Sequence, residues 1–233
     1  MAHPKADSEH FFAEALAADN DIWVEFDGES NEETLEEWIE AYKPSQTYRS
    51  EGIGWICVRL DQKVTSNLSP DVIGLQESWE QLQRSGRPIN YQTITQLAKA
   101  HDVTSGKWFM HVDSGGKVDH LWRLVAYGVM EGKLGQCAKV SPFDDIGGHV
   151  KHVICIYNET FTDAEEVFQL ENAIRHACGI KCQMKYKPDV YTYLGVYRKN
   201  KWGLRPSVYE SVYDISTGTS HVTTNSGEEP MEC

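Results

Sequence analysis

Cationic and aromatic side chains alternate with apolar ones along the segment from Lys107 to Val112. In an extended strand, successive side chains point to opposite faces of the sheet. The alternation therefore places Trp108 on one face, and Lys107 and His111 on the other. A basic side chain beside an aromatic ring suits a ligand that carries both phosphate and a base. We interpret the Trp108 face as buried and the Lys107 face as open.

Two later strand-like runs, at residues 136–141 and 150–157, extend this pattern. Their alternation puts Lys139, Lys151 and Tyr157 on the same open face as Lys107 and His111. We therefore expect these five residues to form one nucleotide- or RNA-binding surface.

A basic stretch runs from Lys181 to Arg205, with seven cations against the single carboxylate of Asp189. Aromatic residues are interleaved with these cations, as in proteins that bind single-stranded nucleic acid. The candidate contacts in this stretch are Lys185, Lys187, Tyr191 and Arg198. Two alternatives stay open, because a charge run can be a solvated face and the tyrosines can be the core-facing side of a strand.

Motifs of enzymes and metal sites are not found in the sequence. It contains no Gly-x-Ser-x-Gly, no phosphate-binding loop ending in Gly-Lys-Ser/Thr and no His-Glu-x-x-His. His176, Cys178 and Cys182 match the spacing of no common zinc module. We expect no catalytic residues, no metal and no cofactor, and we interpret the six cysteines as thiols.

Nothing in the chain reaches 18 consecutive apolar residues, and the first residues lack the apolar core of a signal peptide. These observations predict a cytosolic or nuclear protein that does not enter a membrane.

Periodicity and capping residues predict the elements of secondary structure. Helices are expected at residues 8–20, 31–42, 70–84, 91–101, 117–131 and 163–178, with Ser69 as the cap of the third. Strands are expected at residues 54–60, 107–112, 136–141, 150–157, 181–186, 190–198 and 207–215. This order predicts an α+β fold, with a curved, mainly antiparallel sheet and helices packed on one face.

The net charge of −13 is distributed unevenly along the chain. Residues 1–51 hold 14 acidic and 3 basic side chains, and residues from 216 onward are rich in Ser, Thr, Gly and Glu. We therefore predict three regions: an acidic helical N-terminal segment (residues 1–50), an α+β domain (51–215) and a disordered tail (216–233).

The domain resembles the cap-binding translation initiation factor 4E over residues 53–194. The resemblance is carried by Gly106-Lys107-Trp108-Phe109 and by Val118-Asp119-His120-Leu121-Trp122, followed by the strand pair that ends at Tyr157. It implies that Lys107 and Lys139 occupy phosphate-binding positions. The positions that correspond to the family's stacking residues read Leu97-Ala98-Lys99 and Asp61-Gln62-Lys63-Val64-Thr65 here, so ordinary cap binding is not expected.

Nearly the whole chain is also similar to the uncharacterised Bles family (basophilic-leukaemia-expressed protein). The motifs that carry this similarity are Ala138-Lys139-Val140-Ser141-Pro142 and Tyr186-Lys187-Pro188-Asp189-Val190-Tyr191-Thr192-Tyr193-Leu194-Gly195. The resemblance implies the fold of the initiation factor, and the family has no settled biochemical role.

Three functions remain as hypotheses. The first is a non-catalytic binder of RNA or a nucleotide on the open face. The second is a protein-interaction adaptor whose helical face, with Trp79 and the Trp122 helix, meets a protein partner; the acidic N-terminal segment could also dock over the basic face. The third is an enzyme that acts on a nucleotide or an RNA end.

Overall fold

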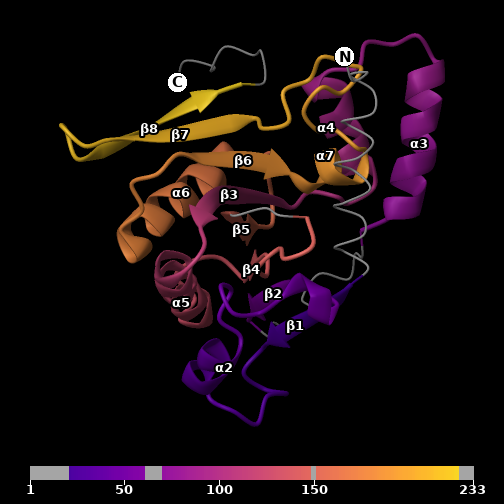
Figure 1. The fold of residues 1–233 in the computed structure, drawn as a ribbon. Coiled ribbons are helices and arrows are strands. Elements are labelled where there is room, and N and C mark those ends of the chain that lie inside the picture. Colours follow the sequence, from indigo (N-terminus) through magenta and orange to yellow (C-terminus); the bar gives the residue numbers. More distant parts are fainter. Residues whose placement is uncertain (1–20, 61–69, 148–150, 226–233) are drawn as a thin grey trace.

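The computed structural model describes residues 21–60, 70–147 and 151–225 (Figure 1). Within them, eight strands form a single sheet in the order β1-β2-β4-β5-β3-β6-β7-β8. The strands are β1 (Ile22–Phe26), β2 (Ile53–Arg59), β3 (Gly106–Asp113), β4 (Cys137–Val140), β5 (Lys151–Asn158), β6 (Met184–Pro188), β7 (Tyr209–Asp214) and β8 (Thr219–Thr224). β1 and β2 are parallel, and the other paired strands are antiparallel. This is the α+β architecture with a mainly antiparallel sheet that the sequence predicts.

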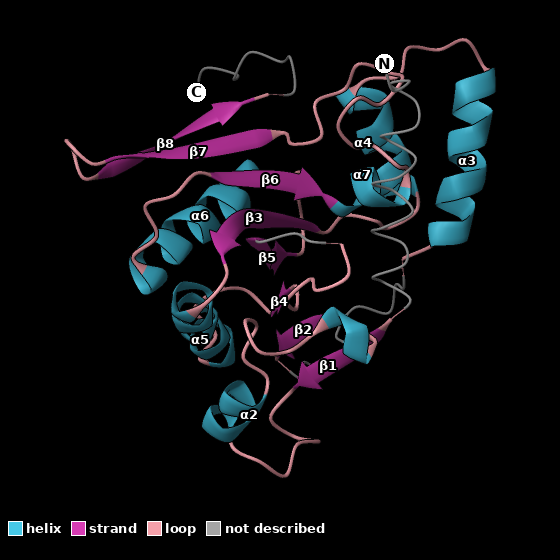
Figure 2. Ribbon diagram, in the orientation of Figure 1, coloured by secondary structure: helices cyan, strands magenta, loops and turns pink. Residues whose placement is uncertain are grey.

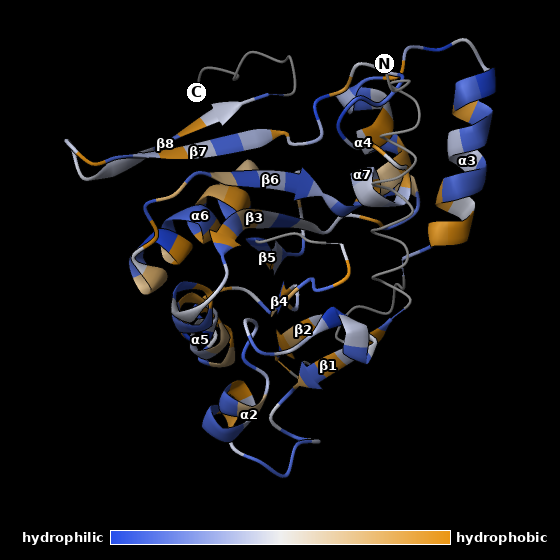
Figure 3. Ribbon diagram, in the orientation of Figure 1, coloured by the Kyte–Doolittle hydropathy of each residue, from blue (hydrophilic) through white to orange (hydrophobic). Residues whose placement is uncertain are grey.

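The helices are grouped around this sheet (Figure 2). They are α2 (Leu35–Ala41), α3 (Val72–Arg84), α4 (Tyr91–Ala100), α5 (Gly116–Met130), α6 (Ala164–Cys178) and the short α7 (Asp189–Tyr193), with a 3₁₀ turn η1 at Arg49–Glu51. Helices α5 and α6 lie side by side against the central strands, while α3, α4 and α7 are gathered at the end of the sheet where β6 stops. Along α3 and α6, hydrophobic and hydrophilic residues alternate, as expected of helices with one buried side (Figure 3).

Several helices begin where capping chemistry predicts. Asn90 caps α4 by accepting a hydrogen bond from the Thr93 backbone N–H, and Asp163 caps α6. The predicted cap at Ser69 is wrong, because Asp71 is the residue whose carboxylate accepts the Gly74 N–H at 2.8 Å. The helix predicted at residues 8–20 lies outside the described residues.

The core lies between the sheet and α5 and α6, and it contains both tryptophans of the central strand–helix unit. Trp108 on β3 and Trp122 on α5 have no exposed surface, as predicted. The Trp108 Nε1–H donates to the Val167 carbonyl of α6 at 2.8 Å, which ties the strand to the helix that covers it. The Trp108 face of the sheet is therefore the covered one.

A buried ion pair attaches the C-terminal strands to this core. Arg175 on α6 pairs with Glu171 at 2.8 Å, and it donates to the hydroxyl of Ser211 on β7 at 2.7 Å. The Ser211 hydroxyl in turn donates to Glu171 at 2.5 Å. Arg175, Glu171 and Ser211 thus hydrogen-bond to one another, and the β7 strand is held to α6 by these specific bonds as well as by apolar packing.

The region predicted as a strand at residues 190–198 is instead the helix α7 followed by a loop. Pro188 lacks a backbone N–H and stands as the helix N-cap, and Gly195 ends the turn with a φ of +69°. Val190, Tyr191 and Leu194 are buried at helical spacing. The tyrosine alternation in this segment therefore favoured the wrong element.

Both predicted region boundaries need correction. Strand β1 lies within the predicted N-terminal segment and pairs with β2, so residues 22–26 belong to the same sheet as the domain. Strand β8 lies within the predicted disordered tail and pairs with β7 along its whole length. The described part of the chain thus has ordered sheet strands beyond both predicted limits.

Replacing Trp122 by Ala is expected to lower the free energy of unfolding by about 3–5 kcal/mol, because a large aromatic ring leaves a cavity in the core. Ile73→Ala on α3 is the control, since Ile73 is 74% exposed and surface substitutions stay within about 0.5 kcal/mol. Urea unfolding of both variants measures the difference. Equal midpoints for the two variants would contradict the packing described above.

Candidate functional site

A cavity of about 500 Å³ opens on the face of the sheet opposite α5 and α6. We call it the open-face cavity. It is lined by Trp55, Lys107, Phe109, His111, Lys139, Val153, Cys155, Lys187, Thr192, Tyr197, Arg198 and Pro206. Three of these residues are lysines and one is an arginine, three are aromatic, and no carboxylate is among the described residues of the lining.

The register of the strands explains why these residues meet. Partners in register share a face of the sheet. One row of partners on the open face consists of Glu25, Cys57, Lys139, Cys155, Phe109, Lys185 and Glu210. The neighbouring row places Lys107 directly between Tyr157 on β5 and Lys187 on β6. The predicted grouping of Lys107, Lys139 and Tyr157 on one face therefore agrees with the register.

Lys107 is fixed at the floor of the cavity by a carboxylate. Its ammonium contacts Asp189 at the start of α7 and donates to the Thr192 hydroxyl at 3.3 Å. The other oxygen of Asp189 accepts a 2.6 Å hydrogen bond from Ser105. Burial has the largest single effect and lowers the pKa of Lys107, but the charge and hydrogen bond of Asp189, together with Cys155 and Tyr197, raise that pKa above its ordinary value. Lys107 is therefore a charged residue whose counter-ion is already in place.

Lys187 is the partner of Lys107 in the β3–β6 pair, and its pKa is shifted in the opposite direction. Its residue is 7% exposed, and its Nζ lies 3.6 Å from the centroid of the Tyr197 ring. Burial, and then repulsion by Lys107, lower the pKa of Lys187 well below its ordinary value, although Asp189 opposes the shift. Two amines thus share one carboxylate, and Lys107 is the one in contact with it.

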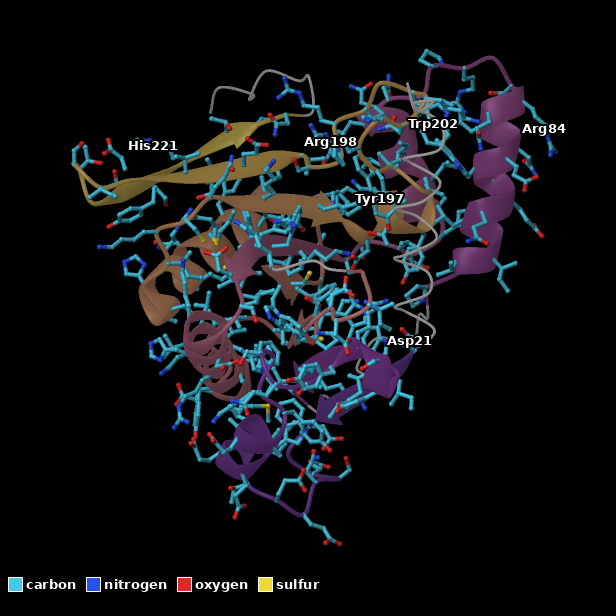
Figure 4. The ribbon with its side chains drawn as sticks, in the orientation of Figure 1. Asp21, Arg84, Tyr197, Arg198, Trp202 and His221 are labelled. Carbon is cyan, nitrogen blue, oxygen red and sulfur yellow. The ribbon has the colours of Figure 1, made fainter. Side chains whose placement is uncertain are left out.

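The loop after α7 forms one wall of the cavity. Tyr197 and Arg198, labelled in Figure 4, stand on this loop beside β6 and β7. The Asn200 side chain holds the loop by donating to the carbonyls of Tyr197 and Leu204 at 2.8 and 2.6 Å. Trp202 fastens it to the helices by packing on Trp79 with ring centroids 4.8 Å apart. The ring over Lys187 is therefore carried by a fixed segment.

Two tryptophans of the edge strands stand on the open face next to Lys139. Trp23 on β1 and Trp55 on β2 are in register, with ring centroids 6.4 Å apart. The Lys139 Nζ lies 4.3 Å from the centroid of Trp23 and 4.0 Å from that of Trp55. Both distances are within the range of a cation–π contact. The aromatic end of the cavity therefore already holds a cation from the protein itself.

The remaining titratable groups of the lining are favoured in their neutral forms. Burial raises the pKa of the Cys155 thiol, despite the nearby charges of Lys107 and Lys139. Partial burial lowers the pKa of His111, and the positive charges of Lys151 and Lys185 lower it further. Positive charge in the cavity therefore comes from lysine and arginine and not from histidine.

The structure brings together five of the nine predicted site residues as lining of the cavity. These are Lys107, His111, Lys139, Lys187 and Arg198.

Three other predicted residues lie on the same face outside the lining. The Tyr157 ring centroid is 5.3 Å from the Lys107 Nζ, and Tyr157 lines a neighbouring cavity of about 550 Å³. Lys151 contacts Asp113 at 3.3 Å, and Lys185 contacts Glu210 at 3.3 Å. Both lysines are therefore engaged at the margins of the face.

The prediction for Tyr191 is wrong. Tyr191 is 2% exposed and lies in the core on α7, because helical spacing replaces the strand alternation that would have turned it outward. The predicted basic stripe is also divided, since Lys185, Lys201 and Arg205 contact Glu210, Trp202 and Asn225, respectively.

Trp23 and Trp55 are not among the predicted site residues, because stacking rings were expected only at positions taken from the initiation factor, and Trp23 was assigned to the acidic segment that could dock over the basic face. A usable signal was present, because Trp55 alternates with Ile56 and Val58 and shares its parity with Arg59. The open face therefore does hold two tryptophans.

Among residues 21–60, 70–147 and 151–225, no three His, Cys, Asp or Glu side chains are grouped in a way that could hold a metal ion. Of the helices described, none is both long enough and apolar enough to span a membrane.

Comparison with known proteins identifies a family and a structural likeness. The family described as "Basophilic leukemia-expressed protein Bles03" matches residues 75–195, which is more than half of the chain. Among solved structures, the chain is similar to a schistosome eIF4E complexed with m7GpppA and 4E-BP, with a TM-score of 0.36 and 15% identity over 46% of this chain and 58% of that one.

It is also similar to eIF4E-3 of C. elegans in complex with Mextli and a cap analog, with a TM-score of 0.32, at 15% identity over 37% of this chain and 51% of that one. For Ascaris suum eIF4E-3 with an m7G cap, the TM-score is again 0.32, at 13% identity over 37% of this chain and 51% of that one. The chain thus spans between about half and three fifths of the length of these structures.

Replacing Lys187 by Met is expected to stabilise the protein at pH 7 by about 1–3 kcal/mol, since a buried amine with a lowered pKa is exchanged for an apolar side chain of similar length. An unfolded lysine titrates near pH 10.4. Between the lowered folded pKa and about 10.4 the unfolded chain binds more protons, so Lys187 makes stability rise with pH. Urea unfolding between pH 7 and 10 should show a smaller rise for the variant.

Lys185→Met is the matched control on the same strand and face. Its partner Glu210 lies 3.3 Å away in a half-buried pair, and such pairs contribute about 0–1 kcal/mol. A loss of stability on Lys187→Met as large as that of a core deletion would contradict the lowered pKa of Lys187.

Proposed function

Because this chain belongs to the Bles03 family of basophilic leukemia-expressed proteins, and because its sheet carries the open-face cavity, we propose that the protein binds a nucleotide, free or as part of an RNA, in that cavity. The observation that carries the proposal is the lining itself, in which lysine and arginine stand beside aromatic rings and no described carboxylate takes part. The volume of about 500 Å³ is within the range of small-ligand pockets, which is about 300–1,000 Å³.

The phosphate of the ligand is assigned to the cations at the centre and at the loop wall. Lys107 contributes less than its charge implies, since Asp189 already balances it. Lys139 and Arg198 therefore provide most of the attraction, and Lys187 gains a proton when an anion approaches. Charge-assisted contacts of this kind are stronger than neutral hydrogen bonds.

The base is assigned to the indole of Trp55, the tryptophan that lines the cavity. Lys139 lies over this ring, so it has to move aside as the base enters, and a phosphate is a suitable new partner for its ammonium. Stacking on an aromatic side chain contributes about 1–3 kcal/mol per base and tolerates any base. The proposed binding is therefore weakly selective for sequence.

A positively charged base is disfavoured in the same place, because the ammonium of Lys139 is within 4.3 Å of both tryptophan centroids. We therefore expect a methylated cap analogue to compete no better than an unmethylated nucleotide. From the sequence, the same result was expected because stacking tryptophans were thought to be lacking. Here the reason is the repulsion between the positively charged base and the ammonium of Lys139.

The adaptor hypothesis has less support from the described residues. Trp79 and Trp122, which it assigned to the helical face, are 6% and 0% exposed. Neither ring can therefore form the centre of an interface without unpacking the core.

Titration of the full chain with a nucleoside monophosphate is expected to show binding that weakens as salt is added, because salt screens the attraction between its phosphate and the cations of the cavity. Lys139→Met and Arg198→Ala should each weaken it about tenfold or more, since a charge-assisted contact contributes about 1.5–3 kcal/mol. Trp55→Ala should weaken it by about 1–3 kcal/mol. Calorimetry or tryptophan fluorescence measures all three.

Lys151→Ala is the control, because Lys151 lies on the same face but is paired with Asp113 outside the cavity. The free nucleoside and inorganic phosphate should each bind at least about tenfold more weakly than the nucleoside monophosphate. If inorganic phosphate bound as well as the nucleotide, the role of Trp55 would be refuted. Unchanged affinity in Lys139→Met and Arg198→Ala would refute the site.

A further inference from the structure

We propose that Lys187 is a nucleophilic amine, which condenses with the carbonyl group of an aldehyde or ketone that also carries an anionic group. The site is the open-face cavity, and the product is an imine on Lys187. This activity is separate from nucleotide binding, since it needs a carbonyl carbon at Lys187 and does not need a base on Trp55.

The position of Lys187 meets the geometric requirement for such chemistry. Its side chain lines the cavity while the residue is 7% exposed, so a ligand reaches the amine from one side and bulk water is largely excluded. Its partner in register is Lys107, which places a second cation beside it on β3. A lysine that is desolvated and next to another cationic group is a recognised form of activated nucleophile.

The groups that face Lys187 come from four elements. Lys107 on β3 repels a proton on Lys187, while Asp189 on α7 and the Cys155 thiol on β5 attract one. The centroid of the Tyr197 ring of the loop lies 3.6 Å from the Nζ, and this ring also favours the charged amine. Asp189 is already in contact with Lys107 and Ser105, so its attraction for a second ammonium is reduced.

Burial and the neighbouring cation therefore prevail, and the pKa of Lys187 is well below its ordinary value. The consequence for reactivity is large. An ordinary lysine with a pKa near 10.4 has only about one amine in 2,500 unprotonated at pH 7. Each unit by which the pKa is lowered raises that fraction about tenfold, until the amine is mostly free.

The balanced reaction uses only groups at the site and the ligand. The lone pair of Lys187 attacks the carbonyl carbon, and a proton moves from the nitrogen to the oxygen to give a carbinolamine. The remaining hydrogen on this nitrogen passes to the hydroxyl group as the carbon–oxygen bond breaks, so that one water departs and the C=N bond forms without any change of oxidation state. The positive charge of a protonated imine is tolerated there only beside the ligand's own anionic group.

That anionic group is assigned to Lys139 and Arg198, which line the same cavity as Lys187. The substrate class is therefore a phosphorylated or carboxylated aldehyde or ketone that fits within about 500 Å³.

The test uses the full chain and pyridoxal 5′-phosphate as the probe, an aldehyde that carries a phosphate. At pH 7 the imine is trapped by reduction with borohydride, and the modified lysine is identified by peptide mass mapping over a time course. Lys187 is expected to be modified at least tenfold faster than Lys185, the lysine of the same strand and face that is paired with Glu210. Modification of Lys185 at the same rate as Lys187, or of surface lysines alone, would overturn the proposal.

Two variants of the neighbouring lysine test the cause of the reactivity. Lys107→Met removes the adjacent charge and leaves Asp189 available to the ammonium of Lys187, so the rate at pH 7 should fall about tenfold and the pH profile should move upward. Lys107→Arg keeps the charge and should keep the rate. Identical profiles for the three folded proteins would overturn the assigned cause, and if Lys107→Met does not fold, the comparison of Lys187 with Lys185 still decides.

A nucleoside monophosphate added before the aldehyde separates the two proposals. Modification of Lys187 that the nucleotide does not slow would support the reactive amine and contradict nucleotide binding. Nucleotide binding in the titration without modification of Lys187 would refute the reactive amine alone.

Discussion

The register of strand β3 determines both faces of the molecule at once. Trp108 is completely buried and donates to the Val167 carbonyl of α6, so the strand cannot slip by one residue without moving this indole into water. The same register turns Lys107 to the open face, between Tyr157 and Lys187. The core therefore stabilises an arrangement of charges that would not form by its own attraction, since two of its members are amines.

The shared carboxylate sets the character of the site. Asp189 lies where β6 passes into α7, and Pro188 is the reason that the strand ends there. The carboxylate reaches Lys107 and Ser105, and Lys187 is left with an aromatic ring above it. A chain selected for stability alone would favour an apolar residue at this buried position. A buried group in a cavity whose pKa is perturbed by loss of water and by a specific charged neighbour is a candidate functional residue.

The predictions from sequence succeeded where one periodicity covered a whole element. The strand with Trp108 was predicted because apolar residues alternate along all of it. The helix with Trp122 was predicted because apolar residues recur at helical spacing over several turns. The cavity residues Lys107, His111 and Lys139 followed from the same alternation. The prediction for Tyr191 failed because Pro188 caps a short helix and Gly195 follows it with a positive φ. The alternation of tyrosines in this segment therefore does not correspond to a strand.

The tryptophans were missed for a different reason. Trp23 stands on an edge strand that the acidic composition of its surroundings concealed, and its neighbour in space, Trp55, is 32 positions later in the chain. The proximity of Lys139 to both rings depends on the parallel β1–β2 pairing and on the antiparallel β2–β4 pairing together. Non-local pairings of this kind are a property of the assembled sheet and not of any one segment.

Charge on the open face is graded from the margins to the centre. Towards the margins, Lys185 and Lys151 have carboxylate partners in Glu210 and Asp113, so these cations are already satisfied. Nearer the centre, the ammonium groups of Lys139 and Lys187 lie over the rings of Trp55 and Tyr197. Aromatic faces hold a cation less strongly than a carboxylate does and release it at smaller cost. Lysines on this face therefore differ in their contacts, with carboxylates at the margins and aromatic rings nearer the centre.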